Sequence, residues 1–240
     1  MSLVPVLPDN ERRDWIRLAR TQNIGPVTFA QLLKRFGSPA AALDALPEIA
    51  RRAGRGRPIV VPSVADIDAE IDATQRYGAR IVASCEADFP PLLRTLAPPP
   101  PILTLLGRAP LAAEPTVAIV GARNASAAGR KLARDIAAGL GEAGFVTVSG
   151  LALGIDGEAH AASLRTGTIA VLGGAVDHVY PPQHERLYAE IAADGLIVSE
   201  SPFGYRAKAQ DFPRRNRIIT GLSRGVVVVE AAERSGSLIS

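Results

Sequence analysis

Five short apolar runs recur at nearly even spacing through the second half of the chain. They begin near residues 116, 145, 168, 196 and 226, so successive intervals are 29, 23, 28 and 30 residues. Each gap carries a helical pattern, and Leu132, Ile136 and Leu140 mark the first. Repeated strand–helix units predict a parallel sheet with helices on both faces. The predicted fold class is α/β, a doubly wound, Rossmann-like domain whose ligands bind outside the carboxyl ends of the strands.

The N-terminal part of the chain has a different pattern. Residues 11–46 place apolar side chains at helical spacing, interrupted by the turn Asn23-Ile24-Gly25-Pro26. Two helices joined by such a turn are typical of a small all-α, SAM-like or helix-hairpin-helix module, although a simple helical bundle with a glycine turn fits equally well. The stretch RRAGRGRPIVVPS at 51–63 is typical of a linker. We therefore expect a helical domain over residues 1–60 and a Rossmann-like domain over residues 61–240.

Composition is that of a globular protein, with 47% hydrophobic residues and a formal net charge of only +3. The lone Cys85 cannot form an internal disulfide, so the chain needs no oxidising compartment. No segment approaches the roughly 20 apolar residues of a membrane span. We expect a cytoplasmic protein with no membrane contact. The informative charge is local: five basic residues between positions 203 and 217 face one acid, Asp211. They are Arg206, Lys208, Arg214, Arg215 and Arg217.

The loops after the first two predicted strands argue against a nicotinamide cofactor. Arg123 stands where a dinucleotide-binding turn needs glycine for close approach of a pyrophosphate. Ser149 and Gly150 follow the second strand, where an acidic residue would hold the cofactor ribose. An arginine fork can instead grip a phosphate or stack on a base. We expect no cofactor.

Positive groups are predicted to gather at one edge of the sheet. The loop 149–156 contains Gly150 and Gly154, which can form an anion-binding nest or simply permit tight turns and close packing. An arginine cluster at 214–217 crowds the start of a predicted helix, where each cation is unfavourable by roughly 0.3–1 kcal/mol. With Arg123, these groups should converge at the strand ends with no acidic residue to balance them. That arrangement indicates a polyanionic ligand.

Enzyme signatures are missing from the sequence. It has no GxxxxGK[ST] phosphate loop and no convincing nucleophile elbow with a triad. The three histidines, His160, His178 and His184, lack the spacing of a zinc site, and we expect His160 to be structural. We expect Asp156 to cap a helix and Tyr180 to pack in the core. We therefore predict a protein that is not an enzyme and has no metal site.

Five separated motifs, in order, closely resemble the DNA-processing protein A family (DprA, also called Smf). They are VGAR at 120–123, SGLALGIDGEAH at 149–160, LGGAVDHVYP at 172–181, SE at 199–200 and FPRRNRIITGLS at 212–223. The likeness extends upstream through residues 88–107 and the N-terminal helices. The resemblance implies an extended Rossmann-like domain with a basic pocket, and a homodimer. It also implies a non-catalytic protein that binds single-stranded DNA, protects it during natural transformation and helps load the RecA recombinase.

The resemblance also assigns site residues. Arg123 would contact bases and phosphates, with Ser149 and the two glycines of its loop lining the pocket, and Lys208 a further contact in a variable loop. The candidate DNA-binding residues are Gly121, Arg123, Ser149, Gly150, Gly154, Lys208, Arg214, Arg215, Asn216 and Arg217. The family's domain continues past the final GSLIS, so we expect this chain to end within the family's fold. Dimerisation of this length of chain is left open.

A second reading comes from a different functional class. Related Rossmann-like folds include phosphoribohydrolases, which cleave the base from a sugar phosphate and carry a PGGxGT-type loop with a catalytic glutamate. The closest stretch here, LGGAVDHVYP at 172–181, lacks that pattern. The phosphoribohydrolase reading remains the alternative to DNA binding.

Overall fold

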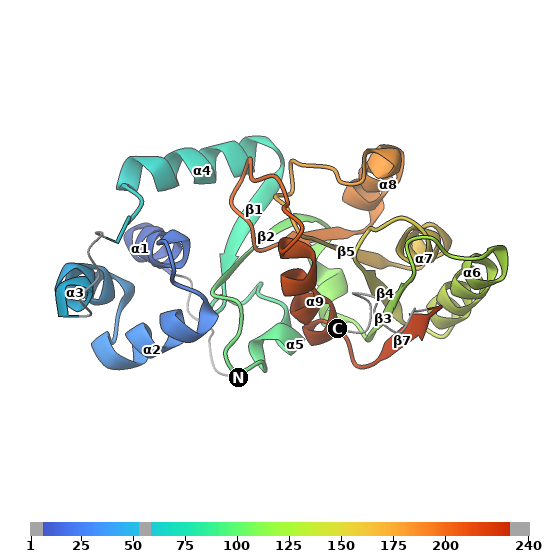
Figure 1. The fold of residues 1–240 in the computed structure, drawn as a ribbon, viewed down its shortest axis with the longest axis horizontal. Helices are drawn as coiled ribbons and strands as arrows, with labels where there is room; N and C mark the ends of the chain where they lie inside the picture. Colours follow the sequence, from blue (N-terminus) through green and yellow to red (C-terminus); the bar gives the residue numbers. More distant parts are fainter. Residues whose placement is uncertain (1–6, 53–58, 231–240) are drawn as a thin grey trace.

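The computed structural model describes residues 7–52 and 59–230, and its centre is a seven-stranded sheet (Figure 1). The strand order is β1-β2-β6-β5-β4-β3-β7. The strands are β1 (Ala79–Ala83), β2 (Ile102–Gly107), β3 (Thr116–Gly121), β4 (Val146–Ser149), β5 (Thr168–Leu172), β6 (Leu196–Ser199) and β7 (Val226–Val229). Each of the five predicted apolar runs forms a strand.

The five strands β3 to β7 are parallel to one another, whereas β2 runs antiparallel to both β6 and β1. The predicted α/β class and the mainly parallel sheet are therefore confirmed. The strand order reverses at β3, with β4 on one side and β7 on the other, where Ala118 pairs with Val226. This reversal is the topological switch point, where doubly wound folds commonly bind ligands.

Helices cover both faces of the sheet because the strand residues alternate between two apolar clusters. Val120 packs in a cluster with Ile218 of α9, whereas its neighbour Ile119 packs with Ala133 of α6 and Ile155 of α7. The helices are α1 (Asp9–Arg20), α2 (Pro26–Phe36), α3 (Pro39–Arg52), α4 (Val64–Arg76), α5 (Pro91–Arg94), α6 (Ala127–Glu142), α7 (Ile155–Ser163), α8 (Glu185–Asp194) and α9 (Asp211–Gly221). Thus α6, α7 and α8 lie on one face, and α5 and α9 on the other.

The N-terminal helices α1 to α3 pack around Leu18, Phe29 and Leu46. The predicted turn is present: α2 begins directly after Gly25, with Pro26 as its first residue. Arg51 and Arg52 end α3, so the predicted linker starts as helix, and its residues 53–58 lie outside the described part of the chain. The predicted domain boundary at residue 60 stays a prediction.

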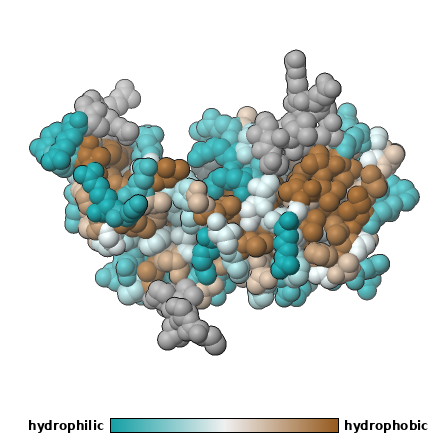
Figure 2. All heavy atoms as spheres, turned by 90° about the horizontal axis from the view of Figure 1, so that it is seen from below, coloured by the Kyte–Doolittle hydropathy of each residue, from teal (hydrophilic) through white to brown (hydrophobic). Residues whose placement is uncertain are grey.

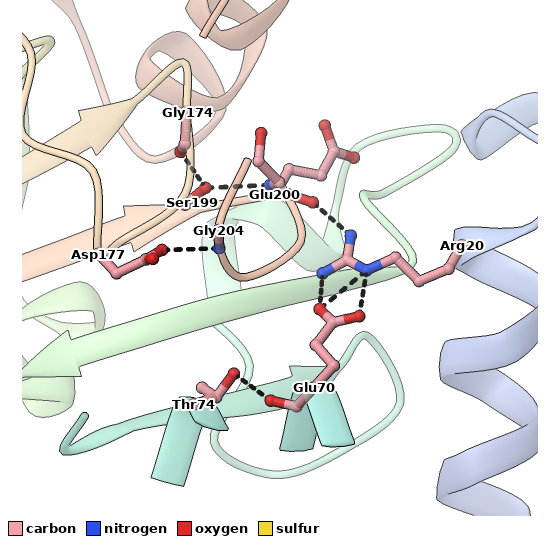
Figure 3. Close-up of polar contacts among 9 residues, drawn as sticks. Arg20, Glu70, Thr74, Gly174, Asp177, Ser199, Glu200 and Gly204 are labelled. Carbon is pink, nitrogen blue, oxygen red and sulfur yellow. Dashed lines mark hydrogen bonds and ion pairs between the residues drawn. The ribbon is translucent and has the colours of Figure 1, made fainter. Parts of the chain in front are cut away.

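Arg20 of α1 joins the helical part to the strand ends (Figure 3). Its guanidinium pairs with Glu70 of α4 at 2.8 Å and donates a hydrogen bond to the carbonyl oxygen of Glu200 at 2.7 Å. The loop after β6 is itself fixed, because the Ser199 hydroxyl donates to the Gly174 carbonyl at 2.6 Å. The helical domain is therefore held beside the carboxyl ends of the strands.

The edge strand β7 leaves apolar surface exposed, with Val226 41% and Val228 43% accessible. Figure 2 shows hydrophobic residues gathered over one end of the molecule on the face seen from below. Among the described residues, no helix has the length and apolar character needed to cross a bilayer.

Candidate nucleic-acid interface

Three side chains from separate elements meet at the carboxyl edge of the sheet. Arg123 follows β3, Tyr180 follows β5, and Phe212 lies in the first turn of α9. The Arg123 guanidinium carbon is 5.2 Å from the centroid of the Phe212 ring, and the Tyr180 and Phe212 ring centroids are 5.3 Å apart. We call these three residues the aromatic face. Together with Leu153 and Pro181 they line a pocket of about 70 Å³.

The aromatic face is open to solvent. Arg123 is exposed, and Tyr180 is 52% accessible, so the prediction that Tyr180 packs in the core is wrong. Its ring packs against the Phe212 ring and lines the pocket instead of entering a hydrophobic core. Phe212 is half-buried, so the exposed ring of the aromatic face is that of Tyr180. An exposed ring beside an arginine provides a surface on which a base can stack, together with a cation for phosphate or base. Phe212 was not among the predicted site residues, although it directly precedes Pro213 in the FPRRNR motif.

In the loop 149–156, for which an anion-binding nest was one of two interpretations, the backbone donors already bind side chains of the protein. The Gly150 and Ala152 N–H groups donate to Asp156 Oδ2 at 3.1 and 3.3 Å. The intervening Leu151 N–H donates to His160 Nε2 at 3.3 Å. Both acceptors come from α7 and are buried. Three consecutive backbone donors therefore bind the protein's own side chains, and we call residues 149–156 the filled loop.

Burial explains the electrostatics of the two acceptors. Burial raises the pKa of Asp156, opposed by the charge of Arg215 and by the two N–H donors. Asp156 was expected to cap a helix. The residue at the cap position of α7 is instead Gly154, and the Asp156 carboxylate accepts hydrogen bonds from the loop that precedes the helix. Burial also lowers the pKa of His160 to about 3, so its ring is neutral. His160 Nδ1 lies 2.7 Å from Thr168 Oγ1, as expected for a structural histidine.

Arg215 lies beneath the surface, with only 8% of the residue accessible. Its guanidinium donates to the carbonyl oxygen of Gly150 at 2.7 Å and to that of Val171, which links the ends of β4 and β5. Burial lowers the pKa of Arg215 to about 10, and the nearby Asp156 charge opposes that shift. A Cβ atom at position 150 would clash with this guanidinium. Gly150 is therefore needed to make room for Arg215.

The prediction that no acid balances this edge is wrong. Arg217 pairs with both carboxylate oxygens of Glu200, and Arg214 lies 4.0 Å from Asp211. Asp211 is in the first turn of α9, where a carboxylate is favourable because the helix dipole is positive there. The expected repulsion at the helix start is therefore relieved within the protein.

The carboxylate of Glu230 lies at the topological switch point of the sheet, beside the start of α6. Glu230, directly after β7, accepts hydrogen bonds from the Ser126 N–H at 3.0 Å and from the Ser126 hydroxyl at 2.8 Å. These groups stand at the start of α6, where a dinucleotide phosphate would sit in a nicotinamide-binding fold. No local pattern predicts this contact, because Glu230 is 104 residues from Ser126 along the chain.

The ten predicted site residues all lie near this edge, but at two depths. Arg123, Lys208 and Arg214 expose their side chains to solvent, and Asn216 and Arg217 are half-buried. The rest lie beneath: Gly121, Ser149, Gly150 and Arg215 are buried, and Gly154 is half-buried. The Ser149 hydroxyl, for example, donates to the Ile119 carbonyl at 2.6 Å. The side chains that can meet a ligand directly are thus fewer than the motif suggests.

Both parts of the chain match models of one protein family. The family model described as DNA recombination-mediator protein A matches residues 80–240, and a DprA-like N-terminal HHH domain matches residues 9–73. The chain belongs to this family. The DprA resemblance seen in the sequence is therefore confirmed, as is the helical domain preceding the α/β domain.

Several DprA relatives are similar over much of the chain. Protein Smf of Synechocystis sp. is 35% identical over 257 residues, covering 98% of this chain and 62% of the relative. DNA processing protein DprA of Streptococcus pneumoniae is 47% identical over 143 residues, covering 59% of this chain and 50% of the relative. This chain thus spans about 62% or less of the length of these relatives.

Two solved DprA structures are also similar. The X-ray structure from Streptococcus pneumoniae matches with a TM-score of 0.77 and 29% identity, covering 98% of this chain and 82% of that one. The Helicobacter pylori structure matches with a TM-score of 0.62 and 31% identity, covering 67% of this chain and 73% of that one. The Helicobacter pylori work is described as showing a single-stranded DNA binding mode.

Proposed function

We propose that this chain binds single-stranded DNA at the aromatic face, with little preference for sequence and without catalysis. The observation that carries the proposal is the cluster at the carboxyl edge of the sheet in which the exposed Arg123 lies over the half-buried Phe212 ring, with the exposed Tyr180 ring beside it. Aromatic rings accept any base, and each stacked base contributes about 1–3 kcal/mol. Single-stranded DNA presents unpaired bases to these rings, whereas a duplex keeps its bases stacked inside.

The biological role we propose follows the family. The full-length protein would protect incoming single-stranded DNA during natural transformation and help load the RecA recombinase onto it, acting as a cytoplasmic homodimer. Family membership supports this role, and so does the single-stranded DNA binding described for the Helicobacter pylori relative. The N-terminal helical domain, held beside the strand ends by Arg20, lies near the proposed DNA site.

The test is a comparison of single-stranded and duplex DNA in a salt series. A labelled dT oligonucleotide of about 20 nucleotides and a duplex of equal length would be titrated with wild type, Arg123→Ala and Arg165→Ala. Arg165 is an exposed arginine just beyond the end of α7, so it lies at the opposite edge of the sheet and is a matched control. We expect Arg123→Ala to weaken single-strand binding by about tenfold or more and to lower the salt slope by about 0.7 per lost phosphate contact.

Equal and weak binding of both DNAs, unaffected by Arg123→Ala, would contradict the proposal. The chain would then be incubated with nucleoside monophosphates and assayed for free base. Release of base would favour the phosphoribohydrolase alternative.

A further inference from the structure

A second depression adjoins the aromatic face. It lies on the side of the sheet that α6, α7 and α8 cover, and the arrangement of these helices can be followed in Figure 1. It is an open groove of about 740 Å³ between α7 and α8. Arg123 and Leu153 line both this groove and the pocket of the aromatic face. The pocket and the groove therefore share a border formed by these two residues.

The charged groups of the groove leave it with unbalanced arginines. Glu158 is paired with Arg134 at 2.6 Å, and Glu190 is paired with Arg186 at 2.9 Å. Two further arginines line the groove, Arg123 and Arg130, and neither has a carboxylate partner among the described residues. The Arg130 Nε donates to the Ala125 carbonyl at 3.2 Å, which anchors the side chain near the start of α6.

The groove also offers apolar surface and further polar side chains. Leu153 is 39% accessible and Leu187 also lines the groove, as do Gln183 and His184. Apolar contacts beside separated cations suit a chain that alternates bases with phosphates.

The cleft on the other side of the aromatic face is less suited to a polyanion. It lies between the turn before α2 and the strand ends, with a volume of about 490 Å³. Its lining includes the carboxylates of Glu200 and Asp211, and its Arg20 is already paired with Glu70. Among the described residues that line this cleft, Arg214 is the one exposed cation.

We propose that single-stranded DNA bound at the aromatic face continues into the α7–α8 groove, where Arg130 binds a backbone phosphate and Leu153 contacts a sugar or base. This inference rests on the proposed function, because the groove is entered through Arg123. It assigns the strand a direction across the molecule, away from the helical domain.

Oligonucleotide length separates the groove from the aromatic face. Wild type, Arg130→Ala, Arg123→Ala, Arg214→Ala and the matched control Arg165→Ala would be titrated with dT oligonucleotides of about 4 and about 16 nucleotides, the span of known site sizes. We expect Arg130→Ala to weaken binding of the longer strand by about three- to tenfold and to lower its salt slope by about 0.7. Binding of the shorter strand should be unchanged, and Arg165→Ala should match wild type on both.

Each outcome bears on a different claim. If Arg123→Ala weakens binding but Arg130→Ala matches wild type on the longer strand, the groove inference fails and the proposed function stands. If Arg214→Ala instead shows the length-dependent loss, the strand leaves toward the helical domain, and the groove inference is overturned. If Arg123→Ala has no effect on either strand, the proposed function fails as well.

Discussion

The filled loop and the aromatic face stand side by side at the same edge of the sheet, yet they use similar residues in opposite ways. In the filled loop, backbone donors that could hold an anion bind Asp156 and His160, and Arg215 binds backbone carbonyls. On the aromatic face, Arg123 lies over a ring and keeps its charge exposed to solvent. The filled loop is thus a scaffold, and the aromatic face is the surface it supports.

Arg215 belongs to the FPRRNR motif, yet its guanidinium is bound to backbone carbonyl oxygens. It lies 6.0 Å from the centroid of the Phe212 ring and forms part of the wall of the pocket beside the aromatic face. We therefore expect loss of Arg215 to disturb the aromatic face mainly through the fold, whereas loss of Phe212 should act directly on DNA binding.

The largest effect is expected for Arg215→Ala. This change removes two buried hydrogen bonds, from the guanidinium to the carbonyl oxygens of Gly150 and Val171, and each hydrogen bond of a charged group contributes about 1.5–3 kcal/mol. The free energy of unfolding, measured by urea denaturation, should fall by about 3–6 kcal/mol. Arg214→Ala is the control, because its side chain is 73% accessible, and its free energy of unfolding should stay within about 0.5 kcal/mol of wild type. If Arg215→Ala were as stable as wild type but had lost DNA affinity, Arg215 would belong to the DNA-binding surface and not to the scaffold.

Gly154→Ala should be the next most disruptive change. Gly154 has φ +80° and ψ −123°, and a Cβ atom there would clash with the carbonyl oxygens of Ala122 and Arg123. Backbone strain of this kind costs about 1–3 kcal/mol before any clash is added. Gly139→Ala in α6 is the matched control, since a Cβ there meets nothing within 4 Å, and it should stabilise by about 0.5–1 kcal/mol. Equal thermal midpoints for the two variants would contradict the scaffold assignment of this position.

Phe212→Ala tests whether the aromatic face binds DNA. The loss of one stacked base should weaken binding of single-stranded dT by about 1–3 kcal/mol, which is roughly 5- to 150-fold in Kd. Phe212→Trp should keep most of the affinity, because the indole also stacks. Tyr77→Ala removes an exposed ring from a different aromatic pair, with Phe203 at 5.7 Å, and should bind DNA like wild type. If Phe212→Ala bound single-stranded dT with unchanged affinity, the Phe212 ring would not be part of the DNA-binding surface.

The smallest effect is a pH dependence that arises in the filled loop. The folded-state pKa of His160, about 3, lies below the ordinary value of 6.5, so only the unfolded chain is protonated between these values. The resulting stability is complete above about pH 6.5 and is lost as the pH falls toward 3. Between about pH 7.5 and about pH 5.5, urea denaturation should show a loss of about 1 kcal/mol from this residue. His160→Gln should lack this component, and identical pH slopes in the two proteins would contradict it.

Much of the fold could be predicted from the sequence because its strongest signals are local. The spacing of the apolar runs predicts a parallel sheet, and a parallel sheet brings the loops after its strands to one edge. The convergence of Arg123, the loop 149–156 and α9 followed from that rule. The position of the turn before α2 was likewise readable from Gly25 and Pro26.

The depth of each site residue was harder to predict, because it depends on packing partners far away in the chain. One signal was available for Arg215: it stands three, four and seven residues before Ile218, Ile219 and Leu222, on the apolar stripe of α9. Arg214 stands off that stripe and is exposed. No comparable local signal places the carboxylate of Glu200 on Arg217 or that of Glu230 on Ser126.

The hydrogen bonds of the filled loop have a consequence for the thermodynamics of complex formation. Because its backbone donors are already bound and Arg215 links two strand ends, the wall behind Phe212 has few groups left to order when a ligand binds. Ordering entropy in a complex at this edge therefore falls on the flexible ligand and on a few exposed side chains such as Arg123. The protein meets its ligand as a preorganised surface.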